Sequence, residues 1–426
     1  MRILVIGGGG REHTLAWALA KSAGVEKMYA IPGNPGMENI AECVLGISIT
    51  DNVALVDFAQ KNKIDLTVVG PEIPLANGVV DAFTAAGLKA FGPSQAAAEI
   101  EGSKAFSKNL MKKYGIPTAK YEVFTDAQKA REYVKQEGAP IVIKADGLAA
   151  GKGVIVATTM EQALEAVDSI MCDNTFGSAG SRVVIEECLV GEEASLLAFT
   201  DGDTIVPMIS SQDHKRAFDH DEGPNTGGMG TYAPAPVVTK EILAKVQKEV
   251  LEPTIAAMKQ EGRKYIGCLY AGLMITADGP KVIEFNARFG DPETQVVLPL
   301  LDGDLAQIML ACIDGKLNET QVKWKDEAAV CVVMAAGGYP ASYNKGDLIT
   351  GIDTAEQGGA VVFHAGTAKN NEGIVTSGGR VLGVVATAKD VKLAVDRAYQ
   401  AVDKIKFNNA HYRHDIAHHA ISRLNK

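Results

Sequence analysis

The chain has 426 residues and a formal net charge of −10 at pH 7, with 46% hydrophobic and 22% charged residues. This length predicts two to four domains, and the composition excludes wholesale disorder. The acidic balance argues against a general nucleic-acid binder, which needs a basic surface to neutralise phosphates.

Residues 1–103 are predicted to form an α/β domain. Apolar runs at 2–6, 26–34, 66–70 and 89–93 alternate with helical patterns at 12–22, 52–62 and 75–87. Such alternation is typical of a doubly wound parallel sheet, which binds ligands at the carboxyl ends of its strands. The first apolar run is too short for a signal peptide, and no run approaches the roughly 18 residues of a membrane span.

The segment GGGGREH (7–13) stands between the first strand and the first helix. Glycines let a backbone approach a ligand, and a helix N-terminus favours an anion, so Gly9 and Gly10 are candidates for holding a phosphate. The dinucleotide pattern G-x-G-x-x-G fails, because Glu12 or His13 stands where its last glycine is required. A phosphate or ribose-phosphate site is favoured over a nicotinamide cofactor, and a tight turn without a ligand stays open.

A second unit is predicted at about 120–190, after a helical bridge at 95–115. It contains strands at 120–124, 139–157 and 182–191 and helices at 126–137 and 160–170. KADGLAAGKGV (144–154) is a glycine-rich loop between two strands. It is not a Walker A motif, because Gly153 stands where Ser or Thr is needed. Lys144 is placed to meet phosphates as a point charge, although a loose hairpin with solvated lysines is the alternative.

The stretch EECLVGEE (186–193) follows a strand and is predicted to expose backbone groups to an adenine edge, with Glu193 on ribose hydroxyls. An acidic surface loop is the alternative. Strands are predicted at 193–210, a polar loop at 211–234, a helix at about 239–260, and a hairpin that turns at Asp278–Gly279.

The most informative stretch is VIEFNARFGDPETQ (282–295). In an extended chain Glu284, Asn286 and Arg288 share one face, because side chains alternate with period two. Carboxylate and amide oxygens are ligands that suit Mg²⁺ with substrate phosphates, and an arginine beside them suits an acyl phosphate or a carboxylate. A salt-bridged strand edge is the alternative.

The tail, with the strands AAVCVVMAAGGYP, VVFHAG and RVLGVVATA and a helix at 389–405, is predicted to be an antiparallel α+β domain. The six cysteines contain no C-x-x-C pair, so neither a cysteine zinc site nor a redox motif is indicated. Buried free thiols are expected, which suits a reducing cytosol.

The order of Lys104, Lys144 with its glycine loop, EECLVGEE and Glu284-x-Asn286 resembles the ATP-grasp superfamily. Within it, VIGGGGREH, DHKRAFDHDEGPNTGGMGTYAP and RFGDPETQ resemble the phosphoribosylamine–glycine ligase family over essentially the whole chain. The resemblance implies an N-terminal doubly wound domain (1–103), a central ATP-grasp domain (104–325) whose lid (about 120–190) closes over ATP, and a C-terminal antiparallel α+β domain (326–426).

The resemblance also implies the reaction. Glycine is joined to 5-phosphoribosylamine through glycyl phosphate, giving 5′-phosphoribosylglycinamide, ADP and phosphate in de novo purine biosynthesis. ATP is a substrate and Mg²⁺ or Mn²⁺ the metal. We expect a cytoplasmic monomer with small-molecule substrates and neither nucleic-acid nor membrane partners.

By the same resemblance, each candidate residue receives a role. ATP would be held by Lys104, Lys144, Gly151, Gly153, Glu186, Glu187, Leu189 and Glu193, and the metal by Glu284 and Asn286. Arg288 and Asp213 would be catalytic, and the substrates would contact Gly9, Gly10, Lys215, Asn225, Gly227, Asp291 and Glu293. The strand Leu269–Met274 lacks the further acid of many ATP-grasp enzymes, so the metal count is open.

Two alternatives remain at this point. Another ATP-grasp ligase, such as a carboxylase acting on bicarbonate, would share the ATP half but not GGGGREH or RFGDPETQ. An NAD-dependent oxidoreductase rests only on the N-terminal sheet and leaves Glu284 to Glu293 unexplained.

Overall fold

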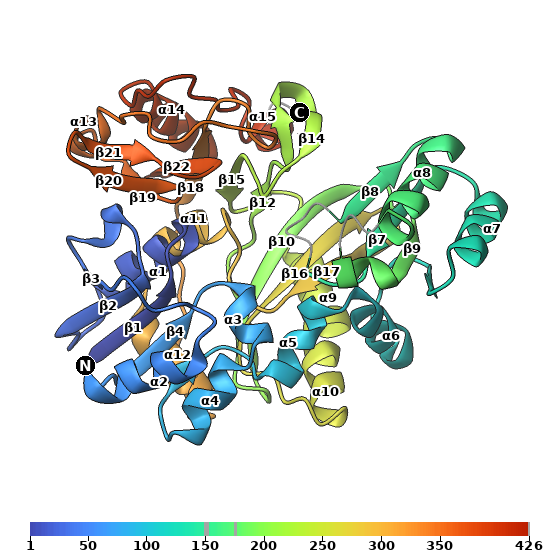
Figure 1. Ribbon diagram of the computed structural model, residues 1–426, viewed down its shortest axis with the longest axis horizontal. Coiled ribbons are helices and arrows are strands. Elements are labelled where there is room, and N and C mark those ends of the chain that lie inside the picture. Colours follow the sequence, from blue (N-terminus) through green and yellow to red (C-terminus); the bar gives the residue numbers. More distant parts are fainter. Residues whose placement is uncertain (149–152, 174–176, 425–426) are drawn as a thin grey trace.

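The computed structural model describes residues 1–148, 153–173 and 177–424. In Figure 1 the blue N-terminal unit lies below the red C-terminal unit, and a central sheet lies between these two units and the green lid. No helix in the described part of the chain is long and apolar enough to cross a membrane.

The N-terminal unit has the predicted doubly wound sheet. Its five strands are all parallel, in the order β3-β2-β1-β4-β5. The order reverses between β1 and β4, which places a ligand crevice at the carboxyl ends of these strands. The elements are β1 (Arg2–Gly7), α1 (Gly10–Leu19), β2 (Lys27–Pro32), β3 (Glu42–Cys43), α2 (Asn52–Lys61), β4 (Leu66–Val69), α3 (Glu72–Ala76), α4 (Val79–Ala85) and β5 (Ala90–Phe91).

The lid is a four-stranded antiparallel sheet in the order β6-β9-β7-β8, and two helices share a small core with it. Two bridging helices lead to it and divide at Ser103, whose hydroxyl accepts the Phe106 N–H and caps the second helix. The elements are α5 (Gln95–Gly102), α6 (Lys104–Tyr114), β6 (Tyr121–Phe124), α7 (Ala127–Glu137), β7 (Ile141–Ala145), β8 (Val154–Ala157), α8 (Met160–Met171) and β9 (Val183–Glu187).

The central antiparallel sheet has the order β11-β10-β16-β17. A β-bulge opposite Gly272 and Leu273 inserts one extra residue into β17, so that Val282 and Phe285 both enter the core although they are three residues apart. The strands are β10 (Glu192–Thr200), β11 (Ile205–Pro207), β16 (Gly267–Thr276) and β17 (Gly279–Asn286), with α9 (Lys240–Val246) and α10 (Glu252–Gln260) packed nearby. A π-helical turn at 247–251 joins the two helices.

The C-terminal sheet corrects one expectation, because the 211–234 segment is not simply a loop. Two of its strands extend this sheet, whose order is β12-β15-β18-β22-β19. The domain boundaries at 103 and 325 stay predictions. The elements are β12 (Gln212–Asp213), β13 (Arg216–Phe218), β14 (Glu222–Asn225), β15 (Gly230–Ala233), α11 (Thr294–Val297), α12 (Leu305–Ile313), β18 (Ala328–Ala335), α13 (Ile352–Gln357), β19 (Val361–His364), β20 (Thr367–Asn370), β21 (Gly373–Thr376), β22 (Arg380–Ala388), α14 (Val391–Val402) and α15 (His418–Leu424).

The six cysteines are free thiols. Three of them, Cys268, Cys312 and Cys331, are buried as expected, whereas Cys172 is exposed on the lid.

Candidate active site

The end of β17 carries the residue around which charged side chains gather. Glu284 is half-buried, and Asn286 follows it on the face that points away from the core. Burial alone would raise the pKa of Glu284, but the charges of three lysines outweigh it and hold the pKa below its usual value. The carboxylate is therefore ionised at neutral pH. The lysines are Lys215, Lys144 and Lys104.

Glu284 and Asn286 fit a hard divalent cation. Among the described residues none forms an ion pair with the Glu284 carboxylate, although cations surround it. The Asn286 Oδ1 accepts a hydrogen bond of 3.3 Å from Arg288. Such oxygens suit Mg²⁺, and lysines beside them suit the phosphates that Mg²⁺ accompanies. On the neighbouring strand Gly272 and Tyr270 lie opposite the two ligand candidates, so β16 adds no carboxylate to them.

Lys144 of the lid and Lys108 of the bridging helix α6 share a buried ion-pair network through Glu186. Lys144 Nζ lies 2.9 Å from Glu186 Oε1 and donates to the Ile283 carbonyl at 3.2 Å. Lys108 Nζ lies 2.7 Å from Glu186 Oε2, and burial lowers its pKa to about 8. Lys104 Nζ donates to the Gly147 carbonyl at 2.9 Å, and burial lowers its pKa too. Glu186 thus positions Lys144 beside β17.

The other residues expected to contact the nucleotide lie on β9, on β10 and beside the glycine loop. β9 ends at Glu187, and Leu189 follows outside any strand. Glu193, on β10, pairs with Lys215 at 2.8 Å. Gly153 is buried, and its carbonyl accepts the Ala145 N–H at 2.8 Å. Gly151 lies outside the described residues.

A second acidic group faces the site from β12. Burial raises the pKa of Asp213 to about 8 even though the Lys215 charge opposes this shift. The pKa of Lys215 is raised well above its usual value, because nearby carboxylates outweigh its burial. Asn225 is exposed on β14. With its pKa raised, the Asp213 carboxyl can exchange a proton close to neutral pH, and in its ionised form it is a candidate proton acceptor.

Arg288, the arginine expected to face the substrate, forms ion pairs with two carboxylates. Arg288 lies just beyond β17, with Nη2 3.0 Å from Glu101 Oε1 and Nε 3.4 Å from Glu72 Oε2. Glu101 also accepts the Ala287 N–H at 2.7 Å. These carboxylates come from α5 and α3 and raise the pKa of Arg288, so the guanidinium stays charged and fixed.

The loop after Arg288, which carries Asp291 and Glu293, contacts the N-terminal unit, the central sheet and the C-terminal sheet. Arg380, at the start of β22, donates to the carbonyls of Gly227 and Asp291, both at 2.7 Å. Its Nη2 lies 3.5 Å from the Asp291 carboxylate. Glu293 Oε1 accepts from the Tyr270 hydroxyl at 2.6 Å. These contacts fix the loop between the central sheet and the C-terminal sheet.

The glycine run before α1 is contacted by the side chain of Glu12 from the same helix. Gly9 N–H donates to Glu12 Oε2 at 2.7 Å, which caps α1. A Cβ at Gly70 would collide with the Glu12 side chain, as would one at Gly7, whose φ is also +123°. Gly9 and Gly10 still border the loop, because a Cβ at Gly9 would lie 3.7 Å from Asp291 Oδ2.

Sequence analysis missed several residues of this site. Their signals were weak, because each is a single charged or aromatic residue whose partner is remote in sequence. Arg11 stood inside the quoted segment GGGGREH, where no role was given to it, and it donates to the Phe289 carbonyl at 3.2 Å. The missed residues are Arg11, Glu72, Glu101, Lys108, Tyr270 and Arg380.

Comparisons with known proteins agree with this layout. Three models of the phosphoribosylglycinamide synthetase family match in order: the N domain over 1–101, the ATP-grasp (A) domain over 102–294 and the C domain over 329–419. Phosphoribosylamine–glycine ligase from Halalkalibacterium halodurans is 54% identical over 99% of this chain and 98% of its own length. The Vibrio cholerae enzyme of the same name is 54% identical over 99% of both chains.

Solved structures give the same result. The crystal structure of phosphoribosylamine–glycine ligase from Thermotoga maritima has a TM-score of 0.86 and 34% identity, covering 98% of this chain and 100% of that one. A biotin carboxylase domain from Hydrogenobacter thermophilus, in complex with MgADP and bicarbonate, has a TM-score of 0.72 and 16% identity, covering 96% and 91%. At that identity only the fold is shared.

Proposed function

The chain belongs to the phosphoribosylglycinamide synthetase family, and from this premise we propose which of its residues ligate glycine to 5-phosphoribosylamine. It is an ATP-dependent carboxylate–amine ligase of purine biosynthesis, and Mg²⁺ is the metal proposed to accompany ATP. This membership replaces the two alternatives, a bicarbonate carboxylase and a nicotinamide-dependent oxidoreductase.

The proposal rests chiefly on the surroundings of Glu284. An ionised carboxylate that attracts three lysines but pairs with none of the described residues is arranged for a cation and a polyphosphate together. Glu284 and Asn286 would hold Mg²⁺, which neutralises phosphate charge when bound. Lys104 and Lys144 would hold ATP phosphates, and the backbone near Glu187 and Leu189 would bind adenine.

The chemistry needs positioning and charge rather than a protein nucleophile. A glycine carboxylate oxygen attacks the γ-phosphorus, the bond to the ADP oxygen breaks, and glycyl phosphate forms. Arg288, fixed by Glu101 and Glu72, would hold the carboxylate and then the acyl phosphate. The amine of phosphoribosylamine attacks the carbonyl carbon, the C–O bond to phosphate breaks, and phosphate leaves.

The attacking amine must lose a proton. Asp213 in its ionised form is the proposed acceptor, with Lys215 beside it; because burial raises its pKa to about 8, the fraction able to accept a proton grows as the pH rises toward that value. Gly9, Gly10, Asn225, Gly227, Asp291 and Glu293 would border the sugar phosphate and glycine. Two observations support this grouping. Asp291 lies beside the glycine run, and Arg380 donates to the carbonyls of both Asp291 and Gly227.

The test is ADP release from Mg-ATP with glycine, with and without phosphoribosylamine made in situ from ribose 5-phosphate and ammonia. We expect sustained ADP release only when both substrates are present, at one ADP for each phosphoribosylglycinamide formed. Release that is indifferent to glycine and the amine would contradict the proposed function.

We also propose that the protein works as a monomer in the cytoplasm. Free thiols at all six cysteines suit a reducing compartment. Sedimentation equilibrium at several concentrations tests the first point, because a mass that rises to twice 44.9 kDa would contradict it.

A further inference from the structure

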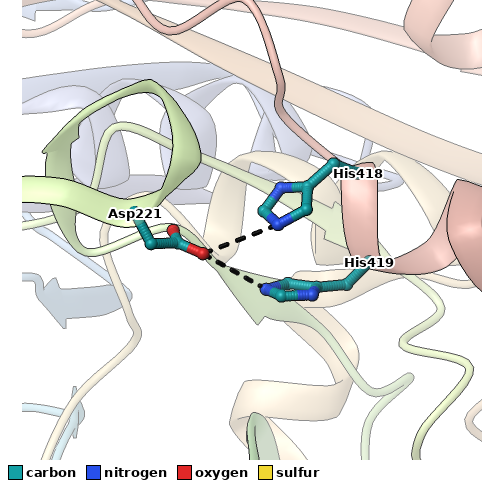
Figure 2. A group of neighbouring side chains, drawn as sticks. All are labelled: Asp221, His418 and His419. Carbon is teal, nitrogen blue, oxygen red and sulfur yellow. Dashed lines mark ion pairs between the residues drawn. The ribbon is translucent and has the colours of Figure 1, made fainter.

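A cluster of metal-ligand side chains lies outside the active site described above. It brings together Asp221, in the turn between β13 and β14, and two adjacent histidines of α15, His418 and His419. Figure 2 shows both imidazoles directed at one carboxylate oxygen. Asp221 Oδ2 lies 3.5 Å from His418 Nε2 and 3.4 Å from His419 Nε2. One ligand atom from each residue lies within 4.8 Å of the other two.

The hydrogen bond at the other nitrogen of His418 fixes its proton. Nδ1 lies 3.0 Å from the Asp415 carbonyl and 3.5 Å from the Asp415 carboxylate, and both partners accept hydrogen bonds. A neutral imidazole thus carries its proton on Nδ1 and presents the Nε2 lone pair to Asp221. Two acceptors that face each other require a cation or a second proton between them. A carboxylate behind a histidine is also the usual support of a metal ligand.

The distances and charges suit a small transition-metal ion. Ligand arms of about 2.0–2.1 Å at tetrahedral angles end roughly 3.3–3.4 Å apart. The oxygen–nitrogen separations given above are close to this. Arg413 pairs with Asp221 Oδ1 at 2.8 Å and with Asp415, which leaves Oδ2 for the histidines. With two carboxylates and one guanidinium, the neutral-histidine cluster has a net charge of −1.

The backbone is strained at one residue of the cluster and at the residue just before its two histidines. Asp221 has a φ of +57°, and the buried Ala417, directly before the two histidines, has a φ of +68°. The Ala417 N–H donates to His214 Nε2 at 3.0 Å, and this bond holds the turn. Left-handed alanine is costly and persists only where the surroundings impose it. Here it sets the start of α15 against the β13–β14 turn.

We propose that Asp221, His418 and His419 bind a divalent transition-metal ion, with Zn²⁺ the favoured metal. The bound ion would connect α15 to the turn before β14. Two imidazoles and one carboxylate favour zinc over Mg²⁺, which prefers oxygen ligands. The three side chains are 32–40% exposed, so solvent completes the coordination. The ion is distinct from the one proposed at Glu284, and it braces the hairpin that carries Asn225.

The test uses the tag-free full-length chain, stripped of metal with a chelator and kept in millimolar Mg²⁺ to occupy oxygen-rich sites. Zinc is titrated by calorimetry, and Co²⁺ is added separately for its visible absorption. We expect one zinc per chain and a tetrahedral Co²⁺ spectrum. His418→Gln and His419→Gln should each weaken zinc binding by about tenfold or more.

His414→Gln is the matched control. His414 comes from the same tail and pairs with Asp219 at 3.0 Å, but it is 69% exposed and is not a ligand candidate. It should bind zinc as the unchanged chain does. If His418→Gln proves unfolded by circular dichroism, the more exposed His419 variant decides. Zinc binding that is equal in all variants, or absent at micromolar zinc, would overturn the proposal and leave a doubly protonated His418 as the partner of Asp221.

Discussion

At the residue scale, the proposed chemistry depends on one carboxylate. Glu284→Gln keeps the shape of the side chain but removes the charge that the three lysines and Mg²⁺ require. We expect turnover to fall by about 100-fold or more, by analogy with the loss of one preorganised electrostatic group in other enzymes. Steady-state ADP release measures this. The melting temperature should fall only modestly: the lysines that lower the Glu284 pKa lose a favourable charge, but no ion pair to a described residue is lost.

The control for this variant is Glu122→Gln, an exposed position on β6 of the lid. It makes the same chemical change away from the site and should leave turnover intact. Unchanged turnover in the Glu284 variant would contradict the metal assignment, and equal losses in both variants would point to a nonspecific effect.

Residues of the site could be predicted from sequence where spacing brings them together. Glu284 and Asn286 lie on one strand at period two, so the pattern alone places them on one face. Glu101 could not be found this way, because the Ala287 N–H it accepts is 186 residues away. Arg380 likewise reaches Asp291 across 89 residues. Which residues become partners over such separations depends on how whole units pack together, and a local sequence pattern contains no information on that packing.

At the element scale, the lid places its lysine from the end of a strand. Lys144 is the last residue but one of β7, just before the glycine loop, and it pairs with Glu186 on β9, so its ammonium is fixed before ATP binds. Lys144→Ala removes one phosphate contact and should weaken ATP binding by about tenfold, as expected for a lost charge-assisted contact. Calorimetric titration with ADP or a nonhydrolysable ATP analogue measures this.

The matched control is Lys129→Ala on α7, which removes an exposed lysine from the same lid. Nucleotide affinity should not change there. If the Lys144 variant bound ATP as tightly as the control, the lysine would be a structural partner of Glu186 alone, and the proposed phosphate contact would be wrong.

Elements with strong apolar patterns were predicted well, and short polar ones were not. The parallel strands β1, β2, β4 and β5, the lid and the β16–β17 hairpin follow from runs of apolar residues, whereas the two-residue strand β3 was not predicted. β12 and β15 are two and four residues long and lie in a polar, glycine-rich segment, so composition indicated a loop. β15 is a strand because it pairs with β18, about a hundred residues further along the chain, and β12 in turn pairs with β15.

At the scale of the whole molecule, the site depends on the C-terminal sheet. Besides Asp213 on β12, this sheet carries Arg380 on β22, which bridges the carbonyls of Gly227 and Asp291 and the Asp291 carboxylate. Arg380→Lys keeps the charge but loses the planar fork. We expect KM for phosphoribosylamine to rise by roughly tenfold while ADP affinity stays the same. Arg397→Lys on α14 changes an exposed arginine of the same unit and should have neither effect. A rise in KM for ATP instead would contradict the assigned role.

A buried histidine pair joins the N-terminal and C-terminal units. His13 Nδ1, on α1, accepts the His364 N–H at 2.8 Å, and burial lowers the pKa of His13 from 6.5 to about 3. Burial also lowers the pKa of His364, to about 4. The unfolded chain takes up protons below pH 6.5 and the folded chain does not, so stability is complete above pH 6.5 and falls as the pH drops below it.

His13→Asn keeps an acceptor at the same place but cannot titrate. We expect its melting temperature to decline less steeply than that of the unchanged chain between pH 6.5 and 4. His414→Asn, at an exposed histidine, should follow the unchanged chain. Parallel declines in all three proteins would show that His13 does not contribute to the acid sensitivity.

The central claim is that the glycine carboxylate is phosphorylated by ATP before the amine attacks. The most direct measurement uses glycine labelled with ¹⁸O in both carboxylate oxygens, with ATP and phosphoribosylamine, and mass spectrometry of the released phosphate. Because the leaving phosphate keeps the carboxylate oxygen that attacked phosphorus, one labelled oxygen should appear in each phosphate. Unlabelled phosphate, formed together with labelled product, would contradict the account.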